Sequence, residues 1–118
     1  MHTNKIGLLG EKTAALFLQQ KGYKILYQNY PTSLGEIDII ALENGSLVFI
    51  EVKTRSSLIF GQPYEAVNNE KLKKITRSAE IFTNTHHELP LKWRIDVVSL
   101  VYQTSSASFA VELLKDVS

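Results

Sequence analysis

The spacing of hydrophobic and polar residues divides the chain into two helical segments and several short strands. Residues 4–21 are good helix formers with apolar positions at helical spacing, and Gly22 ends this segment. A second helix is predicted over residues 65–86, where apolar residues recur on one face. These apolar residues are Val67, Leu72, Ile75, Ala79 and Phe82.

The predicted strands are rich in β-branched and aromatic residues and are bounded by turn-forming residues. They are residues 23–30, 36–42, 47–54 and 92–101, with one more short strand over 109–114. Pro31 marks a turn after the first strand, and Asn44-Gly45 predicts a two-residue hairpin. The resulting order, α-β-β-β-α-β(-β), predicts an α/β fold in which two helices flank a mixed central sheet.

Composition predicts an ordinary globular protein. The chain has 118 residues, of which 44% are hydrophobic and 21% charged, and we expect a single domain over residues 1–118. It contains no cysteine, which excludes disulfides and thiolate zinc sites. Because no apolar run has the length of a membrane span and residues 1–5 lack a signal-peptide core, we expect a cytoplasmic protein without membrane insertion.

The charge balance limits how nucleic acid could be bound. The formal net charge is only +1, from 13 Lys and Arg against 12 Asp and Glu. The overall field would therefore not drive binding to a polyanion, and any such binding requires a local basic patch.

Unusual charges in two predicted strands indicate a chemical site. Glu51 and Lys53 share one face of an otherwise apolar strand, where unpaired charges are costly. The Asn44-Gly45 turn would set Asp38 of the neighbouring strand about 5 Å away, one strand spacing. Two carboxylates this close favour a cation between them, and an all-oxygen site suits Mg²⁺ or Mn²⁺, with the Val52 carbonyl as a further ligand.

The first helix offers a fourth member. Glu11 stands at helical spacing from Leu8, Ala15 and Leu18, on a stripe expected to face inward, where it could bind the metal directly or through a water. Each residue alone also has a structural interpretation. Glu51 and Lys53 could form a simple salt pair, Asp38 could cap a turn, and Glu11 could be solvated.

A series of motifs resembles the small YraN-like bacterial family. The segments that carry the resemblance are Gly10-Glu11, Lys21-Gly22-Tyr23-Lys24-Ile25-Leu26, Asn29-Tyr30, Gly35-Glu36-Ile37-Asp38-Ile39-Ile40, Leu47-Val48-Phe49-Ile50-Glu51-Val52-Lys53-Thr54-Arg55, Phe60-Gly61, Glu65-Ala66-Val67, Lys71 and Arg94-Ile95-Asp96-Val97-Val98. That family is similar to archaeal-type Holliday junction resolvases of the PD-(D/E)xK superfamily. Ile37 stands where the resolvases usually have proline before the aspartate.

The resemblance implies a restriction endonuclease-like core with Glu11, Asp38, Glu51 and Lys53 as the active site. The implied activity is Mg²⁺-dependent hydrolysis of DNA phosphodiester bonds, on branched or junction DNA, by a homodimer. The alternatives are a nucleic-acid-binding module that keeps the fold without cleaving, and a pure protein-interaction domain. The sequence does not distinguish DNA from RNA or reveal a substrate shape.

A basic stretch of the second helix is the expected DNA-binding surface. Its cations are Lys71, Lys73, Lys74 and Arg77, and Arg55 after the third strand would join them. A solvated basic helix face is the alternative. His86-His87 is interpreted as a helix-terminal pair, Trp93 and the tyrosines as packing residues, and Arg94 with Asp96 as an ion pair beside the site.

Overall fold

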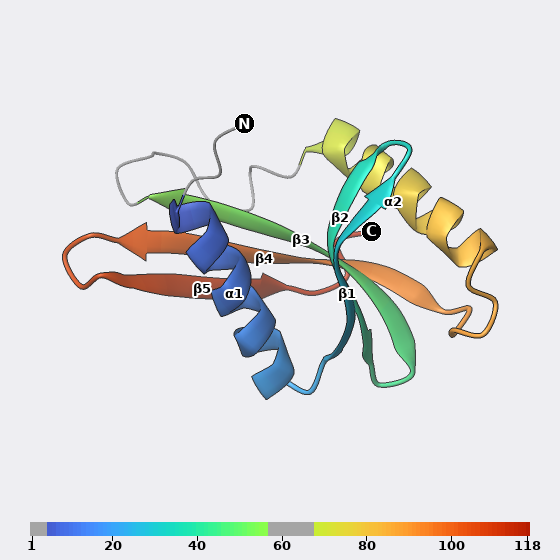
Figure 1. Cartoon of the computed structure of the whole chain (residues 1–118), viewed down its shortest axis with the longest axis horizontal. Coiled ribbons are helices and arrows are strands. Elements are labelled where there is room, and N and C mark those ends of the chain that lie inside the picture. Colours follow the sequence, from blue (N-terminus) through green and yellow to red (C-terminus); the bar gives the residue numbers. More distant parts are fainter. Residues whose placement is uncertain (1–4, 57–67) are drawn as a thin grey trace.

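The computed structural model describes residues 5–56 and 68–118, which contain two helices and five strands (Figure 1). In chain order they are α1 (Lys5–Gln20), β1 (Lys24–Thr32), β2 (Gly35–Glu43), β3 (Ser46–Ser56), α2 (Asn69–Asn84), β4 (Trp93–Gln103) and β5 (Ser108–Leu114). This order confirms the predicted α/β class. The predicted helix positions at Asn4 and Glu65 to Val67, and the motif Phe60-Gly61, lie outside the described residues.

The strands form one mixed sheet in the order β1-β2-β3-β4-β5. Strand β3 pairs in parallel with β4, whereas the other three neighbouring pairs are antiparallel. The parallel pair follows from the connection, because the chain between β3 and β4 includes α2 and returns to the same end of the sheet. The two consecutive hairpins from β1 to β3 form a meander of three antiparallel strands.

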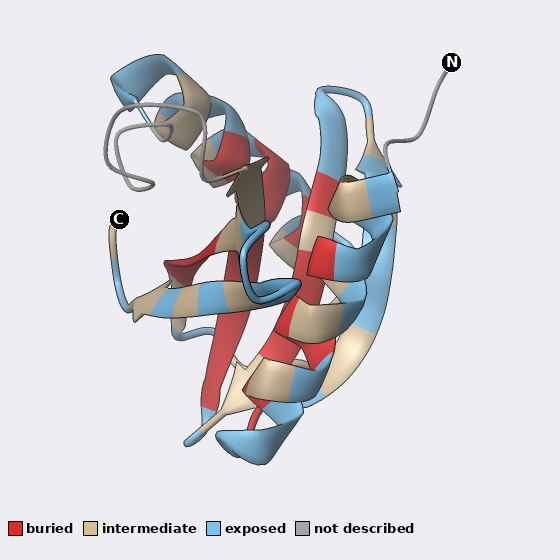
Figure 2. Ribbon diagram, turned by 90° about the vertical axis from the view of Figure 1, so that its left-hand side faces the viewer, coloured by how far each residue is buried: buried red, intermediate tan, exposed pale blue. Residues whose placement is uncertain are grey.

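The two helices cover opposite faces of the sheet, and the buried residues lie mainly in the strands between them (Figure 2). On β3, the alternation of side chains divides the core as predicted. Val48 and Ile50 pack with α1, whereas Leu47 and Phe49 pack with α2. The same alternation continues into the polar end of β3, so Glu51 and Lys53 lie on the α2 face.

The ends of the helices follow recognised capping rules. Gly22 has φ 95°, the left-handed conformation that ends a helix, and the N–H of Tyr23 donates to the Leu18 carbonyl at 2.9 Å. At the start of α2, the Asn68 side chain accepts a hydrogen bond from the Lys71 N–H at 2.8 Å. The first helix thus ends where the sequence predicts.

Two local expectations are wrong. Leu8, placed by the sequence pattern on the inward stripe of α1, is 48% exposed, because this helix packs through its small residues Gly10, Ala14 and Ala15. The turn predicted at Pro31 comes later, because Pro31 still pairs with β2.

Neither described helix combines the length and the apolar character that a membrane span requires.

Candidate active site

A tight contact between α1 and β3 brings the first helix to the site. Gly10 is buried on α1, and a Cβ at this position would collide with the Thr54 side chain. The missing side chain lets the helix backbone approach the strand that carries Glu51 and Lys53. Glu11 follows directly and is half-buried, and its charge contributes to the raised pKa of Asp38.

The β2–β3 hairpin brings the two strand carboxylates together. Asn44 and Gly45 both have positive φ, 50° and 77°, as a two-residue type I′ turn requires. The strand pairing from this turn ends at Ile39 opposite Ile50, so Asp38 and Glu51 are the next residues along the two strands. This arrangement confirms the predicted hairpin register.

Asp38 occupies the point where the two strands cease to pair. Its Oδ2 accepts a hydrogen bond from the Val52 N–H at 2.8 Å, a bond that replaces a main-chain partner from β2. Burial raises the pKa of Asp38 to about 7, and the neighbouring charges of Glu51 and Glu11 contribute to this rise. The hydrogen bond from Val52 opposes the shift. The capping interpretation of Asp38 is therefore wrong, since its partner is a neighbouring strand.

Glu51 is almost completely buried and contacts two ammonium groups. Its side chain is 7% exposed, and its Oε2 lies 3.6 Å from Lys53 Nζ and 3.3 Å from Lys71 Nζ. The salt pair of Glu51 and Lys53, expected from sequence as the structural interpretation of these residues, is present. The contact with Lys71 adds a second cation from α2, which sequence reasoning placed on the DNA-binding surface.

The contact of Lys71 could have been found from its spacing in α2. Lys71 precedes the buried residues Ile75, Ser78 and Phe82 by four, seven and eleven positions, which places all four on one helical stripe. A cavity of about 120 Å³ lies beside this stripe. Its lining includes Glu36, Glu51, Lys71 and Lys74.

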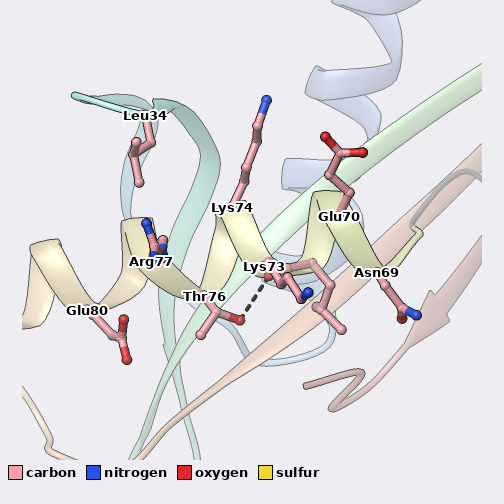
Figure 3. A pocket seen from close by; sticks show the side chains of 9 residues that line it. Leu34, Asn69, Glu70, Lys73, Lys74, Thr76, Arg77 and Glu80 are labelled. Carbon is pink, nitrogen blue, oxygen red and sulfur yellow. Dashed lines mark hydrogen bonds between the residues drawn. The ribbon is translucent and has the colours of Figure 1, made fainter.

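The remaining basic residues of α2 are exposed, as predicted for a surface patch. Lys73, Lys74 and Arg77 border a broad open hollow of about 740 Å³ together with Leu34 from the β1–β2 turn (Figure 3). Glu70 and Glu80 also line this hollow, so its charge is mixed. Arg55 is half-buried near the end of β3, two residues after Lys53 and on the same face.

The oxygen donors at the site fit Mg²⁺ or Mn²⁺ better than Zn²⁺. Within residues 5–56 and 68–118, no group of three or more His, Cys, Asp or Glu side chains is arranged to hold a metal ion. Asp38 and Glu51 form a close carboxylate pair, and Glu11 influences Asp38 through its charge. Mg²⁺ is usually bound through one or two carboxylates and keeps several waters, and a carboxylate pair matches this preference.

A second cluster of charges lies on the opposite face of the sheet. Asp96 is fully buried, and it accepts hydrogen bonds from Arg94 Nε at 2.9 Å, Tyr23 Oη at 2.7 Å and the Asp116 N–H at 2.9 Å. Arg94 also donates to Glu43 at 2.7 Å. The predicted ion pair of Arg94 and Asp96 is therefore confirmed, but its expected position beside the site is wrong.

The ring-bearing residues have structural roles, in agreement with their sequence interpretation. His86 follows the end of α2, where its Nδ1 lies 2.8 Å from the Phe82 carbonyl oxygen and its ring stacks on that of Phe82 at 3.8 Å. Trp93 packs edge-on against Phe49 at 5.5 Å.

Comparison with known proteins gives relatives that match nearly the whole chain. A UPF0102 protein of Caldicellulosiruptor saccharolyticus is 39% identical over 116 residues, which is 98% of both chains. One from Dictyoglomus thermophilum is 43% identical over 105 residues, or 89% of each chain. One from Alkaliphilus oremlandii is 49% identical over 98 residues, covering 81% of this chain and 84% of the relative.

The family profile that matches spans residues 10–100, a range that includes Glu11, Asp38, Glu51, Lys53 and Lys71. This span exceeds half of the 118 residues. The chain therefore belongs to the uncharacterised protein family UPF0102.

Proposed function

We propose that this protein is a Mg²⁺-dependent endonuclease that hydrolyses phosphodiester bonds of DNA. The observation that carries the proposal is the carboxylate pair of Asp38 and Glu51, set among buried residues with Lys53 beside it. A structural ion pair would set a base beside each acid, whereas the charges that act on Asp38 are those of two other acids, Glu51 and Glu11. Such an arrangement of like charges is typical of sites that hold a cation or transfer protons.

The residues of the site have distinct roles in this proposal. Asp38, Glu51 and the carbonyl of Val52 would hold Mg²⁺ or Mn²⁺, with Glu11 as an additional acidic group. The bound ion would supply polarisation of the phosphodiester and a more acidic water. Lys53 orients the attacking water and offsets the negative charge that develops on the phosphate. Burial of Glu51 keeps these charges in a medium where they interact strongly.

The DNA backbone is the proposed partner of the basic surface on α2. Lys73, Lys74 and Arg77 are exposed along one helix, which gives a spaced row of cations without requiring a strongly basic chain. Arg55 extends the row beyond the catalytic strand. We expect the protein in the cytoplasm with the DNA, and as a homodimer on substrates with two-fold symmetry.

Cleavage assays test the catalytic residues. We expect Glu51→Gln and Lys53→Met to lose at least about 100-fold in Mg²⁺-dependent cleavage of four-way junction, flapped or linear DNA. Glu112→Gln is a matched control, because Glu112 is an exposed carboxyl on β5. Circular dichroism checks that each variant is folded. Cleavage by both site variants at the rate of the wild type would refute the assignment.

The same assays decide between the nuclease and the non-cleaving binding module. A module would bind these DNAs with the affinity of the proposed enzyme but leave them intact in Mg²⁺ and Mn²⁺. Duplex RNA of the same sequence serves as the comparison substrate, because the sequence does not distinguish the two nucleic acids.

Salt titration tests the basic surface. Each of Lys73→Gln and Arg77→Gln should weaken DNA binding uniformly across sequences and lower the salt dependence of the binding constant by about one ion. Glu80→Gln, at an exposed position of the same helix, controls for changes in α2. A binding constant that does not change with ionic strength would exclude phosphate contacts by this surface.

A further inference from the structure

Two lysines compete for one oxygen of Glu51. Lys71 Nζ lies 3.3 Å from Oε2 and Lys53 Nζ lies 3.6 Å from the same atom. The proposed mechanism uses only Lys53, which lies on β3 with Glu51. Lys71 comes from a different element, α2. We propose that Lys71 is a displaceable counter-ion: it neutralises Glu51 in the metal-free site and moves to the phosphate of the DNA when a divalent cation binds Glu51.

The burial of the Glu51 side chain explains why a counter-ion is needed. Glu51 is 7% exposed, and a buried carboxylate without a cation is costly. The neighbouring carboxyl of Asp38 adds a further acid to the same place. A metal-free protein therefore requires positive charge at Glu51, which Lys53 and Lys71 supply together.

The two lysines differ in how easily they can leave. Lys53 is on the same strand and face as Glu51, two residues away, so its backbone holds it beside the carboxylate. Lys71 reaches across from α2, and its side chain is 42% exposed against 29% for Lys53. Lys71 has the more exposed side chain and is not held beside Glu51 by a shared strand, so it is the lysine that is displaced.

The backbone of Lys71 stays in place during this exchange. Its N–H donates to the Asn68 side chain, which fixes the first turn of α2. The next inward residue, Ile75, is in the core that α2 forms with the sheet. Only the flexible side chain needs to move, which requires no change in the fold.

The space for the displaced ammonium lies beside the site. The cavity of about 120 Å³ that Glu51 lines is also bordered by Lys71 and, one turn further along α2, by Lys74. Lys71 and Lys74 both line this cavity, together with the carboxylate of Glu36. Paired ammonium groups suit a phosphate group, so Lys71 would couple binding of the metal to binding of the DNA backbone.

Calorimetric titration of DNA-free protein with Mn²⁺ tests the first step without any measure of cleavage. The proposal rests on the metal site of the proposed function. Because the cation no longer has to displace an ammonium, Lys71→Met should bind Mn²⁺ about tenfold more tightly than the wild type. Lys24→Met removes the same charge from an exposed position on β1, outside the proposed site, and should leave the Mn²⁺ affinity near that of the wild type.

The outcomes separate the two proposals. Wild-type protein that does not bind Mn²⁺ would overturn the metal site and with it the proposed function. Wild-type binding with unchanged or weaker binding by Lys71→Met would overturn only the role of Lys71. Lys71→Arg keeps the charge and should bind Mn²⁺ as the wild type does, which guards against an effect of misfolding in Lys71→Met.

A DNA-binding measurement tests the second step. With Ca²⁺ as a divalent probe, Lys71→Met should lose about tenfold in affinity for DNA, and without a divalent ion it should lose much less. An equal loss in both conditions would show a permanent phosphate contact and contradict the exchange.

Discussion

The two charged clusters of this protein lie on opposite faces of one sheet and differ in how their charges are satisfied. On the α1 face, Asp96 has no exposed surface but accepts hydrogen bonds from Arg94, Tyr23 and a backbone N–H. On the α2 side, Asp38 accepts one hydrogen bond from Val52 and lies next to another acid, Glu51.

The difference shows how a structural cluster can be distinguished from a functional one. Around Asp96 each acid has a base, and the hydrogen bond to Asp96 raises the pKa of Arg94 while that from Arg94 lowers the pKa of Glu43. Both directions mean that the surroundings stabilise the charged forms of these side chains. Around Asp38 the environment opposes ionisation of the carboxyl group. We attribute the presence of an acid at this unfavourable position to the chemistry that we propose for the site.

The largest effect on stability is expected from breaking the structural cluster around Asp96, in which each acid has a base as partner. Asp96→Ala leaves the Arg94 guanidinium partly buried with only Glu43 as an acidic partner, and removes the acceptor of the Tyr23 hydroxyl. We expect a loss of about 3–5 kcal/mol in the free energy of unfolding, measured in urea. A loss below about 1 kcal/mol would mean that this cluster does not hold the α1 face together.

Removing the charge of Asp38 should have the opposite effect and raise the free energy of unfolding. Folded Asp38 keeps its proton up to a pKa of about 7, against 3.8 ordinarily, so the folded state binds more protons than the unfolded state between these values. Wild-type stability contributed by this group therefore falls as the pH rises from about 4 to about 7, and then stays constant. Asp38→Asn removes that loss.

We expect Asp38→Asn to stabilise the metal-free protein by roughly 2–3 kcal/mol at pH 8 and by almost nothing at pH 4. Urea denaturation at the two pH values measures this difference, with Glu80→Gln as an exposed control. Equal effects at both pH values would contradict the shifted pKa of Asp38.

A smaller effect is expected from moving α1 relative to the site. Gly10→Ala forces the helix away from Thr54, at a cost of about 1–2 kcal/mol. It should also lower the pKa of Asp38 toward its ordinary value, because Glu11 moves away. Carboxyl NMR titration measures this shift. Combining the change with Thr54→Ala should restore most of the stability, and a failure to do so would place the strain elsewhere.

The smallest effect is expected at the edge of the structural cluster around Asp96. Lys115 lies 3.4 Å from Glu43, but its side chain is 51% exposed. Removing it by Lys115→Ala should change the stability by less than about 0.5 kcal/mol, because solvent screens exposed pairs. A loss of stability as large as that of Asp96→Ala would show that the exposed pair of Lys115 and Glu43 contributes as much as the buried contacts of Asp96.

Local patterns predicted the fold well. The element order follows from strand-like runs and apolar periodicity, and the hairpin that brings Asp38 to Glu51 follows from the backbone preferences of Asn44 and Gly45. The side of β3 that carries Glu51 follows from alternation alone. These features depend on neighbours in the chain, which a single sequence displays.

Features that depend on distant residues could not be predicted in the same way. The bond from Tyr23 to Asp96 joins residues 73 positions apart, and nothing in either segment indicates the other. Ala15 and Leu18 of the stripe expected to face inward on α1 are buried, but Leu8 is exposed, because the helix approaches the sheet closely at Gly10 and Ala14. Both errors arise from tertiary packing.

The length of the turn between β2 and β3 fixes the register of the two strands, and with it the position of Glu51 relative to Asp38. If the turn keeps its two-residue length, one residue inserted after Gly45 shifts the β2–β3 pairing by one and turns every later β3 side chain to the other face, so Glu51 would leave Asp38. The loop between β4 and β5 imposes no such requirement on the site. Length variation among homologues should therefore be tolerated at Thr104 to Ala107 and absent between Glu43 and Ser46.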